Sequence, residues 1–90
     1  MILITVHNEN TYEIIFEKAT LLFIDEYSNA RKKNYSHEKA FDMAKLSVMD
    51  YLFLLMYKRP KLKEIVHAVY KSMQDDCYLY KKVILLFSPA

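Results

Sequence analysis

Apolar residues recur every three or four positions along most of the chain, which is the spacing of a buried helix face. The first such stretch predicts a helix over residues 11–32, capped by Asn10 or Thr11 and ending in the basic run Arg31-Lys32-Lys33. Its expected buried face consists of Tyr12, Ile15, Phe16, Ala19, Leu22, Phe23, Tyr27 and Ala30.

A second helix is predicted over residues 37–58, after the polar break at Asn34-Tyr35-Ser36. Ser36 suits the N-cap, because its hydroxyl can accept a hydrogen bond from the first turn. The expected buried stripe is Phe41, Ala44, Val48, Tyr51, Leu52 and Leu55, widened by Met49, Phe53 and Met56. Between Tyr51 and Tyr57 the helix is apolar on every side, which predicts either a central place in a bundle or an oligomer interface.

Pro60 ends the second helix and suits the start of a third, predicted over residues 61–76. The apolar stripe of this helix is Leu62, Ile65, Val66, Val69, Met73 and Cys77. Short loops between three helices favour antiparallel neighbours. We therefore expect one mostly α-helical domain over residues 1–90, folded as a small three-helix bundle.

The two apolar ends of the chain allow an additional strand pair. Residues 1–6 are short and β-branched, which predicts a strand. Residues 83–87, beyond a break at Asp75-Asp76, either prolong the last helix or form a second strand beside residues 1–6. A rival interpretation pairs residues 11–16 with residues 1–6 as a hairpin, although the helical spacing continues unbroken to residue 30.

Composition narrows the functions open to this domain. Hydrophobic residues make up 53% of the 90-residue chain, so the core cannot easily hide them, and self-association or a protein partner is the natural outlet. Glycine is absent, which argues against Gly-rich phosphate cradles, dinucleotide fingerprints and nucleophile elbows. One cysteine, no signal peptide and no apolar run of about 20 residues predict a soluble, cytoplasmic protein without a membrane span.

None of the polar motifs in the chain predicts catalysis, a metal site or a cofactor. His37-Glu38 could open an HExxH zinc motif, but residue 41 is Phe, so the second ligand is missing. Glu64 and His67 have the spacing of two ligands on one helix face, yet a di-iron bundle needs a second such pair. Cys77 follows two carboxylates that disfavour a thiolate, so we expect a buried structural cysteine and a protein that is not an enzyme.

Charge is unevenly distributed along the chain. Residues 1–30 carry one Lys against five acids, whereas residues 31–63 carry nine Lys or Arg against three acids. Basic residues beside tyrosines suit phosphate contacts and base stacking. The candidate anion or nucleic-acid contacts are Arg31, Lys32, Lys33, Tyr35, Lys58, Arg59, Lys61 and Lys63. In a helix-turn-helix over residues 37–76, Lys61–Met73 would be the recognition helix, although the glycine common in that turn is absent.

The favoured interpretation is a non-catalytic protein-binding module that is also a homo-oligomer. Such a protein would be a small regulator or inhibitor, of the kind that phages and other mobile elements encode. Tyr and Met are enriched at protein interfaces, and the expected interface is Tyr51, Leu54, Leu55, Met56 and Tyr57. Two alternatives stay open: a nucleic-acid-binding protein that uses the basic clusters, and an oligomer that sequesters a small anionic ligand between its subunits.

Overall fold

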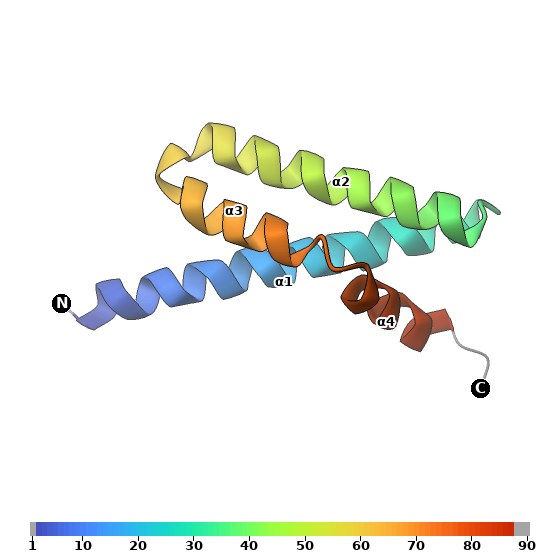
Figure 1. Ribbon diagram of the computed structural model, residues 1–90, viewed down its shortest axis with the longest axis horizontal. Coiled ribbons are helices and arrows are strands. Elements are labelled where there is room, and N and C mark those ends of the chain that lie inside the picture. The colour runs from blue at the N-terminus through green and yellow to red at the C-terminus, as the bar shows by residue number, and fades with distance from the viewer. Residues whose placement is uncertain (1, 88–90) are drawn as a thin grey trace.

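Four α-helices and one 3₁₀ turn make up the described part of the chain (Figure 1). The computed structural model describes the backbone of residues 2–87 and the side chains of residues 10–84. The elements are α1 (Ile2–Lys32), α2 (His37–Lys58), η1 (Pro60–Leu62), α3 (Lys63–Ser72) and α4 (Asp76–Phe87). They form an elongated helical bundle of 49 × 28 × 18 Å, so the expected mostly α-helical fold class is confirmed.

A long antiparallel hairpin of α1 and α2 organises the molecule (Figure 1). In the turn, Asn34 has φ 72°, a left-handed conformation that asparagine tolerates better than most residues. The N–H groups of Asn34 and Tyr35 donate to carbonyls in the last turn of α1 (3.0 and 3.1 Å), which closes that helix with a Schellman motif. Ser36 then caps α2 as predicted, because its Oγ accepts a hydrogen bond from the first turn (3.2 Å).

Small side chains line the contact between α1 and α2. Ala19, Ala40 and Ala44 are fully buried, and alanines at a contact let two helices approach closely. Phe23, Leu52 and Leu79 are the largest of the fully buried side chains that complete the core. The buried apolar residues are Ile15, Ala19, Phe23, Tyr27, Ala30, Ala40, Ala44, Val48, Leu52, Val66, Val69, Met73, Leu79 and Val83. The predicted stripe of α1 is confirmed, since every residue in it is buried or half-buried.

Proline and aspartate set the boundaries of the shorter helices. Pro60 stands first in η1, and Arg59 before it has a non-helical backbone (φ −129°, ψ 76°), because a proline disfavours helix at the preceding residue. α3 then folds back along α2 (Figure 1). Beyond α3, the Asp75 carboxylate accepts a hydrogen bond from the Tyr78 N–H (3.2 Å), which starts α4 beside α1.

The predicted strand pair was wrong for the residues that the structure describes. Residues 2–6 continue α1 towards its N-terminus, and residues 83–87 belong to α4, while Met1 lies outside the described residues. Extending an existing helix costs less than starting a new element, so a β-branched composition did not decide the outcome. The rival hairpin of residues 11–16 with residues 1–6 was wrong for the same reason, as was the cap at Asn10 or Thr11.

The third predicted helix, residues 61–76, proved to be a 3₁₀ turn and a ten-residue α-helix, followed by a break. Pro60–Leu62 is 3₁₀, α3 ends at Ser72, and a new helix begins at Asp76. This break also overturns the expectation of a buried Cys77, whose side chain is exposed. The stripe of α3 stops at Met73, so Cys77 no longer shares its face and lies in the first turn of α4.

Candidate functional site

One face of α2 presents large apolar side chains to solvent. Leu46 is 59% exposed, Phe53 49%, Leu54 52% and Tyr57 84%, while Met43 is exposed to 36%. Asp50 is the acidic residue among them. The outer face of α2, as this surface is called below, comprises Met43, Leu46, Asp50, Phe53, Leu54 and Tyr57. In Figure 1, α1, α3 and α4 all lie on one side of α2, so these helices leave the other side uncovered.

Residues of the outer face are spaced like those in the contact line, or seam, between two paired helices. Residues 43, 46, 50, 53 and 57 alternate steps of three and four, the pattern of the a and d positions in a coiled coil. The buried face of the same helix follows a different row, Ala40, Ala44, Val48 and Leu52, in steps of four. Because both rows are apolar, α2 has one face for its own core and a second apolar face that the described part of the chain leaves largely exposed.

The interface predicted from sequence is divided between these two faces. Leu54 and Tyr57 are exposed on the outer face. Tyr51, Leu55 and Met56 are half-buried and pack against the core instead. Desolvation in this position raises the pKa of the Tyr51 phenol above its ordinary value. The structure adds Met43 and Leu46 to the exposed residues, and their three-four spacing back from Tyr57 was the available signal. It also moves Phe53, expected to widen the buried stripe, to the exposed face.

Contacts between aromatic rings extend the outer face of α2 onto α3. The Phe53 ring lies 5.7 Å from the Tyr70 ring, centroid to centroid, and Tyr70 stacks in turn on His67 at 6.2 Å. His67 is exposed, so the ring pair ends at solvent. The aromatic surface therefore spans two helices, which gives an incoming partner a wider contact than a single helix would offer.

The two basic clusters lie at opposite ends of α2. Arg31, Lys32, Lys33 and Tyr35 surround the α1–α2 turn, and Lys58, Arg59, Lys61 and Lys63 surround η1; all eight are exposed. The 22 residues of α2 separate them by about 33 Å at 1.5 Å per residue. Local contacts engage part of the first cluster, since the Arg31 guanidinium donates to the Tyr35 carbonyl (3.1 Å). The structure therefore does not join the eight residues into one continuous patch.

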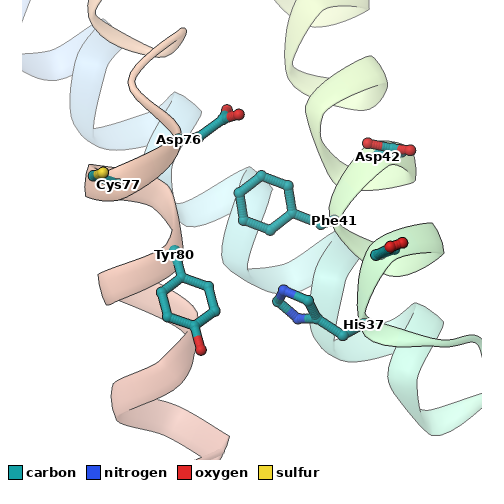
Figure 2. A pocket seen from close by; sticks show the side chains of 7 residues that line it. His37, Phe41, Asp42, Asp76, Cys77 and Tyr80 are labelled. Atoms are coloured by element: carbon teal, nitrogen blue, oxygen red, sulfur yellow. The ribbon is translucent and has the colours of Figure 1, made fainter.

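A hollow of about 460 Å³ lies between the start of α2 and α4 (Figure 2). Its aromatic floor consists of His37, Phe41 and Tyr80, with the His37 ring 5.4 Å from the Tyr80 ring and nearly perpendicular to it. A hydrogen bond of 2.8 Å between His37 Nδ1 and the Tyr27 hydroxyl holds the imidazole in place. The remaining lining residues are Glu38, Asp42, Asp76 and Cys77.

The charge of this hollow suits a cation. Three carboxylates surround three aromatic rings, an environment that attracts positive groups and repels anions. Lys45 neutralises part of the charge, because its Nζ lies 2.6 Å from Asp76 Oδ1. This hollow is therefore unsuited to a small anion, and it is not the site expected from the sequence, which lies between subunits and uses Lys and Arg as donors.

Searches for other kinds of site gave negative results for the described residues. No three His, Cys, Asp or Glu side chains among them are grouped so that they could hold a metal ion. None of the helices in that part of the chain has the length and apolarity that crossing a bilayer demands. No protein-family model matches the chain, and no curated protein or solved structure shows significant similarity to it.

Proposed function

We propose that this chain is a non-catalytic protein-binding module, a small regulator or inhibitor, and that the outer face of α2 is its docking surface. The observation that carries the proposal is the exposure of five large apolar side chains on one helix, four of them at seam spacing. Scattered surface leucines are ordinary, but a contiguous apolar face is typical of an interaction site. Leu46, Phe53 and Tyr57 have the size and position of anchor residues.

The energetics of this face favour a protein partner. Covering the exposed half of a large apolar side chain contributes about 1 kcal/mol, at roughly 25 cal/mol per Å². Several such side chains together offset part of the entropy that association costs. The amphipathic face of another helix would fit the seam, because its own apolar residues repeat at the same three-four steps.

The test compares two leucine-to-aspartate variants that differ in place alone. Leu54→Asp puts a charge on the outer face, whereas Leu21→Asp puts one on α1 at a similarly exposed position (58%). Affinity-tagged wild type and both variants are used as baits, after circular dichroism has shown equal helicity. We expect Leu21→Asp to retain the proteins that the wild type binds and Leu54→Asp to lose them. Equal binding by Leu54→Asp would contradict the proposal.

Nucleic-acid binding through the basic clusters is the second candidate. It is favoured by the exposure of seven basic side chains beside Tyr35 and Tyr57, namely Arg31, Lys32, Lys33, Lys58, Arg59, Lys61 and Lys63. Binding of this kind weakens steeply with salt, because it depends on counterion release. Titration of labelled DNA and RNA at 50 and 200 mM salt distinguishes the two candidates, since the outer face of α2 predicts contacts that depend little on salt.

A further inference from the structure

The seam of the outer face continues one step towards the N-terminus of α2. Lys39 lies four residues before Met43, so the complete seam reads Lys39, Met43, Leu46, Asp50, Phe53 and Tyr57. Lys39 and Asp50 are both exposed, and neither forms a salt bridge within the described part of the chain, where the Lys39 ammonium lies 5.8 Å from the centre of the Tyr35 ring. The seam therefore carries one positive and one negative group, eleven residues apart.

From this arrangement we infer that the outer face of α2 binds a second copy of the same chain, antiparallel, in a register that pairs Lys39 with Asp50. The inference rests on the proposed function, because it names the partner of the same surface. A symmetric dimer requires that if residue i meets residue j, residue j also meets residue i. With the twofold axis crossing α2 between Met43 and Leu46, both Lys39–Asp50 pairs form, and Met43 packs against Leu46 of the second copy.

Charge selects this register over the alternatives. A parallel, in-register pair sets Lys39 against Lys39 and Asp50 against Asp50, and like charges directly opposite repel. An antiparallel pair shifted to oppose Lys39 with Tyr57 places Asp50 against Leu46, where the carboxylate loses water and gains no cation. Only the register centred between Met43 and Leu46 gives both charges of the seam a partner of opposite sign.

In the same register, the C-terminal end of the seam contacts the α1–α2 turn of the second copy. Phe53 and Tyr57 extend past the partner's α2 and over the α1–α2 turn of the second copy, where Tyr35 and Lys33 are exposed. A lysine ammonium over a tyrosine face is attracted by the ring. The highly exposed ring of Tyr57 (84%) thereby acquires a basic neighbour, and the basic cluster at the turn acquires a role in assembly.

The experiment uses two charge reversals, Asp50→Lys and Lys39→Asp, each made in the chain of 90 residues. In the inferred register either variant alone places like charges at both pairing positions, lysine against lysine in the first and aspartate against aspartate in the second. A one-to-one mixture restores two attractive pairs in the heterodimer. Sedimentation velocity measures the mass of each sample against the 10.8 kDa chain. Asp25→Lys and Lys18→Asp, at exposed positions of α1, are the matched controls.

We expect the wild type to dimerise, each single reversal to weaken dimerisation by about tenfold, and the mixture and the double variant K39D/D50K to recover wild-type affinity. The controls should dimerise like the wild type. Single reversals that leave dimerisation unchanged, or a double variant that does not recover, would overturn the inferred register. A wild type that stays monomeric would overturn the inference. The proposed function then still stands if Leu54→Asp, and not Leu21→Asp, loses bound proteins, and fails if neither does.

Discussion

The two faces of α2 are both apolar, yet one is buried and the other is not. The inner face consists of Ala40, Ala44, Val48 and Leu52, none more than 2% exposed. The outer face carries Met43, Leu46, Phe53, Leu54 and Tyr57, all exposed. The inner row begins with two alanines, whereas every apolar member of the outer row is large.

The two rows differ in the size of their side chains rather than in hydrophobicity, because the inner row alone contains alanines. Helices pack at axis distances of about 8–10 Å, depending on the side chains between them. Ala40 and Ala44 let α2 approach α1, where Phe23 and Tyr27 fill the remaining space. A row of Leu, Phe and Tyr cannot approach as closely, but it offers the large contact area that an intermolecular interface uses.

The largest expected difference in stability is between two leucine truncations, one on each face of α2. Leu52→Ala removes a fully buried side chain and should lower the free energy of unfolding by about 2–5 kcal/mol, because it leaves a cavity. Leu46→Ala, the same change on the same helix, should alter it by less than about 0.5 kcal/mol at concentrations where the chain is monomeric. Urea denaturation of both variants checks this. A loss at Leu46 as large as that at Leu52 would remove the distinction between the faces.

Enlarging a small residue should show that the inner face tolerates added volume as poorly as it tolerates a cavity. Ala44→Leu overfills the close contact between α1 and α2, and we expect a loss of about 1–3 kcal/mol. Met43→Leu, one position away on the outer face, conserves volume and is exposed, so it should be nearly neutral. Thermal unfolding followed by circular dichroism compares the two variants. Stable accommodation of leucine at position 44 would contradict the role of alanine in helix contact.

Removing the N-cap of α2 should lower the free energy of unfolding without changing which face of the helix is exposed. Ser36→Ala deletes the hydroxyl that accepts the Lys39 N–H, which should cost about 1 kcal/mol. Ser36→Asp keeps an acceptor at the cap and serves as the control. Denaturation measures the loss, and an unchanged stability of Ser36→Ala would show that the cap contributes little.

The smallest effect concerns Tyr51, which is half-buried and packs against the core. Its pKa is raised above 10.0 by desolvation, so the unfolded state loses the phenol proton at lower pH than the folded state does. The stability that this pKa difference contributes is therefore fully present below pH 10 and is lost as pH rises through the pKa of Tyr51 in the folded state. We expect Tyr51→Phe to show a shallower loss of stability than the wild type above pH 10. Identical alkaline profiles would contradict this prediction.

Much of the long hairpin could be predicted from sequence. The three-four spacing from Tyr12 to Ala30 identified the buried face of α1, and Ser36 was identified as the cap of α2. These features depend on local spacing and on one hydroxyl, which the sequence displays directly. The ends of the chain could not be predicted in the same way, because the β-branched run Ile2–Val6 suits a strand locally and only the helix that follows it makes it helical.

The candidate site was only partly predictable, for a related reason. Periodicity placed Tyr51, Leu55 and Met56 on the packed stripe of α2, but because the helix is apolar on every side from Tyr51 to Tyr57, the same residues were also assigned to the interface. Which of the two assignments holds depends on where α1 and α3 lie. Cys77 was misplaced because continued spacing does not reveal a break that Asp75 introduces by capping a new helix. The hollow between α2 and α4 follows from this same break, since it joins residues far apart in the sequence.

The most direct test of the outer face as a binding surface is its accessibility in solution. A soluble gadolinium chelate broadens the NMR signals of exposed methyl groups, and Leu46, Leu54 and Leu21 are similarly exposed in the isolated chain. As protein concentration rises, or when a protein retained by the wild-type bait is added, we expect the Leu46 and Leu54 methyls to become protected while Leu21 stays accessible. Equal broadening of all three leucines under every condition would contradict the central claim that the outer face of α2 is the surface through which this protein binds.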